Sequence, residues 1–239
     1  MSLSARDRLK QQAAAQAVSL LRSGMVVGLG SGTTSAFAVQ RVGELLARGE
    51  LRDLVGVPTS SATEALAHRY KIPLAPADAP PEIDVTIDGA DEVDPQLDLI
   101  KGHGGALLRE KIVAQLSRRV VIIVDEGKIS PRLGTLSQLP VEVLPFAWRT
   151  QMTFLEGCGA RPRLRELGDG KPYLTDQGNY VLDCQFDALG DPATLAAKLG
   201  ARAGIVEHGL FLGLATDVVV AGEQGIRHLT RPAAREDRA

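Results

Sequence analysis

Hydrophobic residues in the first half of the chain form short continuous runs that alternate with longer stretches of helical periodicity. The short runs predict strands at residues 25–30, 54–57, 84–88, 97–100 and 118–125. The stretches between them, with apolar residues at every third or fourth position, predict helices at residues 4–23, 33–49, 61–70 and 106–117. Apolar strands that alternate with helices are typical of an α/β fold with a doubly wound, mainly parallel sheet.

The pattern changes after residue 128. Short strand-like segments separated by turn residues follow, with helices near 148–157 and 192–199, which predicts a small antiparallel α+β unit. The apolar run 216–222 again resembles a strand of the first sheet. We therefore predict an α/β domain of residues 1–133 and 207–239, interrupted by a smaller, ferredoxin-like α+β domain of residues 134–206.

Composition and charge argue against several classes of partner. The 239 residues carry 27 basic and 29 acidic side chains, a net charge of −2, which argues against nucleic acid as the main partner. No apolar run is long enough to cross a membrane, and the N-terminus lacks the apolar core of a signal peptide. The two cysteines, Cys158 and Cys184, form no CxxC pair, so we expect free thiols and a cytoplasmic protein.

The segment GLGSGTTS, residues 28–35, joins a predicted strand to a predicted helix. Backbone N–H groups at such a helix start attract anions, and the hydroxyls of this loop suit a phosphate or a sugar. The loop departs from the dinucleotide fingerprint because Thr33 stands at the third glycine position, and no Gly-Lys-Ser/Thr follows. Helix capping by Ser31 or Thr33 is the alternative explanation.

The segment IDGADEVD, residues 87–94, places several carboxylates just after a predicted strand. This is the edge at which open α/β sheets bind ligands. The spacing does not follow an EF-hand, and no His or Cys is close enough in sequence to complete a transition-metal set, so we expect no metal. Taken alone, the segment could equally be a solvated acidic turn.

The segment KGHGGALLREK, residues 101–111, follows the acidic loop. Lys101 comes after a short strand, and the glycines allow the backbone to approach a ligand closely. Glu110 shares a helix stripe with Ala106 and Ala114, so we expect a partly desolvated carboxylate with a raised pKa, suited to a general base. An exposed Glu110 paired with a neighbouring cation is the alternative.

An anion loop, a pair of acids, a lysine and a buried glutamate thus map to one edge of the predicted sheet. These groups fit a cofactor-independent aldose–ketose isomerisation. A base removes the proton beside a carbonyl, and a cation stabilises the enediolate oxygen.

The sequence resembles type A ribose-5-phosphate isomerase. The segments that carry the resemblance are VGLGSGTTS, VPTS, DGADEVD, KGHGGALLREK, VDEGK, LPVEVLP and TDQGNYVLD. They extend over nearly the whole chain. The resemblance implies a Rossmann-like α/β fold, interconversion of ribose 5-phosphate and ribulose 5-phosphate in the non-oxidative pentose phosphate pathway, no metal or cofactor, and a homodimer or homotetramer.

The resemblance also implies roles for individual residues. Glu110 matches the proton acceptor, Lys101 the group that stabilises the developing negative oxygen, and Asp88 and Asp91 the acids that act at sugar hydroxyls. Substrate-binding positions are implied at Ser31, Gly32, Thr33, Thr34, Asp88, Gly89, Ala90, Asp91, Lys101, Gly102, His103, Gly104 and Lys128. Many family members have glycine in place of His103, so we expect its imidazole to point away from the substrate. Glu92 and Asp94 are expected to be solvated.

Three other functions compete with this interpretation. An aminosugar-phosphate isomerase/deaminase, or a lactonase, could use a similar scaffold, although a deaminase would need a central His with a triad-like partner. A sugar-phosphate sensor would bind without turnover, but such regulators usually carry a helix-turn-helix, and only one helix precedes the first predicted strand here. A nucleotide-binding domain is disfavoured by the missing glycine and lysine of the first loop.

Overall fold

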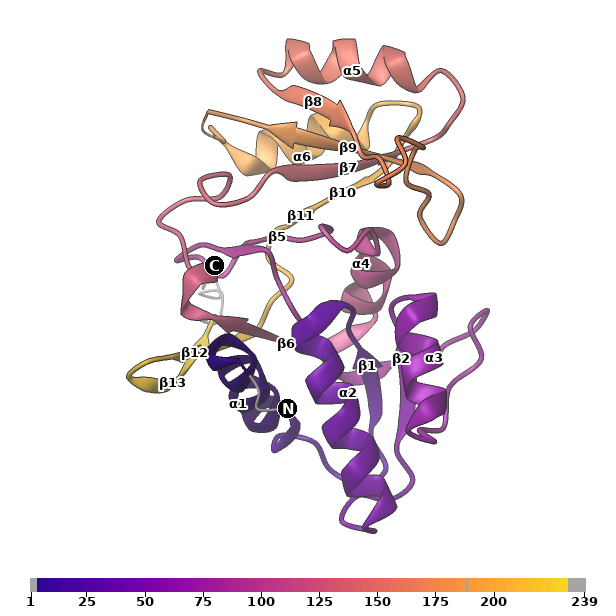
Figure 1. Ribbon diagram of the computed structural model, residues 1–239, viewed down its shortest axis with the longest axis vertical. Coiled ribbons are helices and arrows are strands. Elements are labelled where there is room, and N and C mark those ends of the chain that lie inside the picture. The colour runs from indigo at the N-terminus through magenta and orange to yellow at the C-terminus, as the bar shows by residue number, and fades with distance from the viewer. Residues whose placement is uncertain (1–3, 188, 232–239) are drawn as a thin grey trace, which may run out of the picture.

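A computed structural model of the chain describes residues 4–187 and 189–231 (Figure 1). Its main element is a six-stranded sheet in the order β13-β12-β6-β3-β1-β2. The strands are β1 (Val26–Leu29), β2 (Val55–Pro58), β3 (Ile83–Asp88), β6 (Ser117–Asp125), β12 (Asp217–Gly222) and β13 (Gly225–Thr230). All neighbouring pairs are parallel except β12 and β13. The predicted α/β sheet is therefore confirmed.

Helices cover both faces of this sheet. They are α1 (Ala5–Val18), α2 (Gly32–Ala47), α3 (Ser61–Arg69) and α4 (Leu107–Gln115). In β6, Val121 and Ile123 join the apolar cluster built by α1, α2 and α3. The alternate residues Val120 and Ile122 pack on the other face, in a cluster that includes Ala114 of α4. Because successive side chains of a strand point to opposite faces, a strand buried on both sides reads as one continuous apolar run.

A second, antiparallel sheet follows, with the order β10-β7-β9-β8. Its elements are β7 (Leu139–Val143), α5 (Trp148–Gly157), β8 (Arg161–Leu164), β9 (Tyr180–Gln185), α6 (Pro192–Gly200) and β10 (Ile205–His208). Figure 1 shows this sheet beyond α4, with the short strands β5 (Leu99–Ile100) and β11 (Leu210–Phe211) between it and the main sheet. With β4 (Glu92–Val93), these strands form a small sheet in the order β11-β5-β4. The domain boundaries at 134 and 206 stay a prediction; β10 crosses the second one.

Some predicted elements differ from the structure. The first helix ends at Val18 rather than Ser23, because turn hydrogen bonds from Leu20 to Ala17 and from Leu21 to Val18 replace the helical pattern. The edge strand β13 has no counterpart among the predicted elements, since its residues are mostly exposed and lack an apolar run. None of the helices in residues 4–187 and 189–231 is both long enough and apolar enough to span a membrane.

Candidate active site

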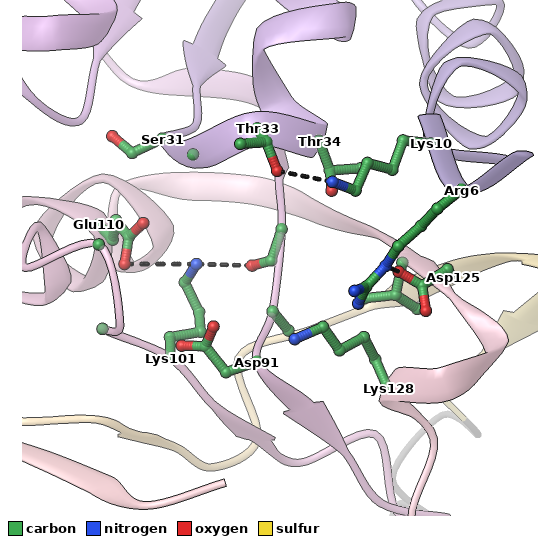
Figure 2. Close-up of a pocket in the computed structure, with 16 residues that line it drawn as sticks. Arg6, Lys10, Ser31, Thr33, Thr34, Asp91, Lys101, Glu110, Asp125 and Lys128 are labelled. Atoms are coloured by element: carbon green, nitrogen blue, oxygen red, sulfur yellow. Dashed lines mark hydrogen bonds and ion pairs between the residues drawn. The ribbon is translucent and has the colours of Figure 1, made fainter. Parts of the chain in front are cut away.

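A pocket of about 260 Å³ lies at the edge where the parallel strands β1, β3 and β6 end (Figure 2). This edge is the usual place for ligands in open α/β sheets. The residues that line the pocket come from six segments: Arg6 and Lys10; Ser31, Gly32, Thr33 and Thr34; Gly89, Ala90 and Asp91; Lys101, Gly102 and Gly104; Glu110; and Val124, Asp125 and Lys128.

Lys101 is the central cation of the pocket, and its side chain is 4% exposed. Its Nζ donates to the carbonyl of Gly89 at 2.6 Å and lies 3.0 Å from Asp88 Oδ2 and 3.3 Å from Glu110 Oε2. Burial alone would lower the pKa of Lys101, but the attraction of Asp88, Glu110 and Asp91 outweighs it and raises that pKa above its ordinary value. The lysine is therefore a fixed positive charge.

Asp88 does not line the pocket, but its carboxylate forms an ion pair with Lys101. Its Oδ1 accepts hydrogen bonds from the backbone N–H of Ser31 (3.1 Å), the hydroxyl of Ser35 (3.1 Å) and the N–H of Gly89 (2.7 Å). A Cβ at Gly30 would overlap the Asp88 carboxylate, which explains the glycine there. Asp88 thus ties the end of β3 to the start of α2 and holds Lys101 in place.

Among the described residues, Glu110 has one cation within ion-pair distance, the ammonium of Lys101. Its Oε2 is buried and makes no hydrogen bond to any described residue, although the ion pair to Lys101 is within 3.3 Å. Burial raises the pKa of Glu110 to about 8, and the negative charges of Asp88 and Asp91 add to the rise, while Lys101 opposes it. Since the pKa values of both Glu110 and Lys101 rise, we assign the ammonium charge to the closer Asp88. Glu110 is then a proton carrier poised near neutral pH.

Asp91 connects the acidic loop with the glycine loop. Its Oδ2 accepts the backbone N–H of His103 at 3.0 Å, and the His103 Nδ1 lies 3.5 Å from Oδ1. The His103 side chain is 44% exposed and does not line the pocket, in agreement with the expectation that its imidazole points away. Figure 2 shows Asp91 beside Lys101 at the pocket wall.

The start of α2 supplies hydroxyls and backbone N–H groups to the opposite wall. Ser31 is the residue before the helix, but its side chain makes no capping bond. Its hydroxyl instead lies 2.8 Å from Thr59 Oγ1 and 2.7 Å from Ser60 Oγ, so the capping alternative for Ser31 is wrong. Thr33 and Thr34, in the first turn, line the pocket, where the positive end of the helix dipole favours an anion.

Two cations of the pocket were missed in the sequence, and both come from α1. Lys10 Nζ donates to Thr33 Oγ1 at 2.9 Å, and Arg6 Nε donates to Asp125 Oδ2 at 3.2 Å. Figure 2 shows Arg6, Lys10 and Lys128 gathered on one side of the pocket. The available signal was the spacing of four between Arg6 and Lys10, which places two cations on one helix face.

Glu92 corrects a second expectation, since it is fully buried rather than solvated. Its two carboxylate oxygens accept backbone N–H groups of Gly134, Thr135, Leu136 and Ser137 at 3.0–3.2 Å. These bonds satisfy the charge without a cation. Glu92 is therefore a structural anchor for the segment after β6, outside the pocket.

The geometry of the pocket agrees with the comparison to known proteins. The sequence model of the family described as ribose 5-phosphate isomerase A (phosphoriboisomerase A) matches residues 55–225. The chain belongs to this family. A ribose-5-phosphate isomerase A of Chloroflexus aurantiacus is 56% identical over 230 residues, which cover 96% of each chain. A probable chloroplastic ribose-5-phosphate isomerase of Arabidopsis thaliana is 48% identical over 94% of this chain and 84% of its own.

Solved isomerase structures share the fold as well. A D-ribose-5-phosphate isomerase in complex with phospho-erythronic acid superposes with a TM-score of 0.92 at 38% identity, covering 95% of this chain and 100% of the other. The ribose 5-phosphate isomerase from Plasmodium falciparum gives 0.91 at 35% identity, covering 94% and 98%. The predicted membership of the isomerase family and the predicted fold class are confirmed.

Most positions that the family resemblance implied line the isomerase pocket. They are Ser31, Gly32, Thr33, Thr34, Gly89, Ala90, Asp91, Lys101, Gly102, Gly104, Glu110 and Lys128. Asp88 and His103 do not line it; each contacts a residue that does. Among residues 4–187 and 189–231, no group of three or more His, Cys, Asp or Glu side chains is arranged to hold a metal ion.

Proposed function

We propose that the protein interconverts ribose 5-phosphate and ribulose 5-phosphate through an enediolate, with Glu110 as the base. The observation that carries the proposal is the position of Glu110, a buried carboxylate that lines the pocket and lies, through Oε2, 3.3 Å from the Lys101 ammonium. A buried carboxylate with a raised pKa can accept a proton, and a cation at this distance can stabilise the oxygen that becomes negative.

The reaction requires one proton to move between neighbouring carbons. Ionised Glu110 takes the proton from C2 of the open-chain aldose, and the C2–H electrons form the C1=C2 bond while O1 becomes negative. Lys101 stabilises that charge. Glu110 then returns its proton to C1, the hydroxyl on C2 loses its proton as C2=O forms, and O1 gains one. The carbon skeleton and the oxidation level of the sugar as a whole are unchanged.

The acids divide their work differently from the expectation drawn from the sequence. Asp91 lines the pocket and is the carboxylate we place against the sugar hydroxyls. Asp88 is 2% exposed and is bonded on both oxygens, so we assign to it the positioning of Lys101 and of the loop at Ser31. Ring opening then depends on Asp91 and water rather than on direct contact with Asp88.

We place the phosphate of the substrate at the end of the pocket away from Glu110 and Lys101. Lys10, Arg6 and Lys128 converge there with the first turn of α2, which includes Thr33. A phosphate dianion gains both charge-assisted contacts and helix-terminal N–H groups at such a position. This arrangement puts C1 and C2 beside Glu110 and Lys101 and favours phosphorylated sugars over free pentoses.

Hydrogen exchange at carbon tests this proposal directly. In D₂O, the wild-type protein should replace the C2 hydrogen of ribose 5-phosphate by deuterium while ribulose 5-phosphate forms, because part of the proton held by Glu110 exchanges with solvent before it returns to carbon. Proton NMR follows both changes. Glu110→Gln should bind the sugar phosphate, but it should neither exchange the C2 hydrogen nor form ribulose 5-phosphate. Exchange that persists in the variant would move the base to another residue. Binding without exchange or turnover in the wild type would favour the sugar-phosphate sensor.

We also propose a cytoplasmic homodimer or homotetramer that needs no cofactor. Leu144 and Phe146 are 46% and 88% exposed, and a second copy could cover this apolar surface. Cys158 and Cys184 are free thiols, which suits a reducing compartment. Light scattering of the purified protein should give a dimer or tetramer mass, and EDTA should leave the rate unchanged. A monomer, or an EDTA-sensitive rate, would contradict this.

A further inference from the structure

The glycine loop beside the catalytic lysine is held from outside by the small sheet. Arg165 follows β8, and its Nη1 donates to the carbonyls of Gly102 and His103, each at 3.0 Å. The Tyr173 hydroxyl donates to the next carbonyl, that of Gly104, at 3.3 Å. Three successive carbonyls of the loop therefore face side chains of the segment that connects β8 and β9 of the small sheet.

The side chain of Arg165 is held in place by a second set of contacts, to Asp183 and Tyr173. Its Nε and Nη2 form a two-point ion pair with Asp183 of β9, at 2.9 and 2.5 Å. The guanidinium carbon lies 5.7 Å from the centre of the Tyr173 ring, and the arginine side chain is only 14% exposed. A planar guanidinium held on one edge by a carboxylate presents its remaining N–H groups in a defined direction.

The direction of the Arg165 N–H groups sets the orientation of the peptide groups in the glycine loop. No cis peptide bond occurs among the described residues, and in a trans peptide the C=O and N–H groups point in opposite directions. With the carbonyls of Gly102 and His103 turned to Arg165, the N–H groups of His103 and Gly104 face away from it. The His103 N–H indeed reaches Asp91 Oδ2 on that side, at 3.0 Å.

The loop has one turn hydrogen bond of its own, from the Gly105 N–H to the Gly102 carbonyl at 2.9 Å, and is otherwise rich in glycine. Gly102 and Gly105 have φ angles of +109° and +77°, a region that glycine enters freely but does not favour over others. The Tyr173 ring occupies the space where a Cβ on Gly105 would lie. Three glycines in five residues leave the backbone many alternatives, so the contacts from Arg165 and Tyr173 add to this single turn bond in selecting one conformation.

We propose that Arg165, held by Asp183, is a positioning residue for the isomerase reaction. It sets the orientation of the peptides at Gly102–Gly104, and through the His103 N–H it places Asp91 in the pocket beside Lys101. The small sheet is thereby part of the catalytic apparatus, although none of its side chains lines the pocket. The kinetic consequence rests on the function proposed above; the structural consequence does not.

Hydrogen–deuterium exchange tests the structural part without reference to activity. In Arg165→Ala, the hydrogen-bonded amides of His103 and Gly105 should exchange at least about tenfold faster than in the wild type, while peptides of β3 and β6 keep their protection. The matched control is Arg161→Ala, because Arg161 lies on the same small sheet and pairs with Asp187 in solvent. Unchanged exchange in the loop would overturn the proposal whether or not the protein is an isomerase.

Kinetics test the consequence. Arg165→Ala should lower kcat/KM about 100-fold, since small displacements of catalytic groups have effects of that size, and added methylguanidine should restore part of the rate. Arg161→Ala should stay at the wild-type value. If Arg165→Ala does not fold, Arg165→Lys, which keeps the charge but not the two-point geometry, should show the same faster exchange and a smaller loss. Wild-type kinetics in both Arg165 variants would overturn the proposal, whereas an inactive wild type would instead reject the proposed function.

Discussion

Replacing Glu110 by glutamine should make the protein's stability less sensitive to alkaline pH. The pKa of Glu110 is raised from its usual value near 4.5 to about 8 by burial, so folding favours the protonated carboxyl. A raised pKa adds to the unfolding free energy. This contribution is complete when the pH is below the pKa of the unfolded state, near 4.5, and it is lost as the pH rises through the folded pKa of about 8. Glutamine is close in shape and neutral at every pH, so the variant does not undergo this loss.

The size of the effect follows from the interval between pH and pKa. Each pKa unit between the unfolded and the folded state corresponds to about 1.4 kcal/mol of unfolding free energy. The shift of Glu110 from 4.5 to about 8 therefore corresponds to about 5 kcal/mol. At pH 6.5, which is about 1.5 units below the folded pKa, roughly 2 kcal/mol of this contribution remains. At pH 9.5 essentially none remains. Lys101 keeps its charge over this range, because its own pKa is raised.

Urea unfolding at pH 6.5 and pH 9.5 measures this difference. The unfolding free energy of Glu110→Gln minus that of the wild type should be about 2 kcal/mol larger at pH 9.5 than at pH 6.5. Glu50→Gln, at an exposed carboxylate, is the control and should give the same difference at both pH values. If the Glu110 variant also gave equal differences, Glu110 would not be a buried proton carrier, and the reasoning from its burial would fail.

Three further substitutions test other parts of the site. Lys101→Met should lower kcat/KM at least about 100-fold and the unfolding free energy by about 3–5 kcal/mol, because Asp88 loses its buried partner; wild-type turnover would contradict this. Lys10→Ala should raise the KM for ribose 5-phosphate about tenfold or more, in steady-state kinetics where Lys198→Ala changes nothing. Glu92→Gln should lower the unfolding free energy by about 1–3 kcal/mol in urea, yet reduce turnover less than Asp88→Asn does; equal losses of turnover would refute the separation of the two acids.

Local patterns were sufficient to predict the parallel strands of the main sheet and the burial of Glu110. Buried parallel strands appear as continuous apolar runs, so their order along the chain and their carboxyl ends are visible in the sequence. Glu110 could be identified as desolvated because Ala106 and Ala114 share its helix stripe, and it is 6% exposed in the structure. Both inferences depend only on the period of one element.

The missed features depend on packing between distant segments. Lys10 enters the pocket because α1 lies against α2, a contact between residues 23 positions apart that no local period reveals. Glu92 lies in an acidic segment that resembles a solvated turn, but the backbone N–H groups of residues 134–137 donate hydrogen bonds to its carboxylate. Arg165 reaches the glycine loop across 62 or more positions. Partners of this kind become apparent only in three dimensions.

The most direct measurement is the rate at which the purified, EDTA-treated protein converts ribose 5-phosphate to ribulose 5-phosphate, with Glu110→Gln assayed beside it. The wild type should convert the sugar rapidly. The variant should lose this activity but still bind the sugar phosphate in calorimetry. Conversion that survives in Glu110→Gln would contradict Glu110 as the base. Tight binding with no conversion by the wild type would contradict the isomerase function itself.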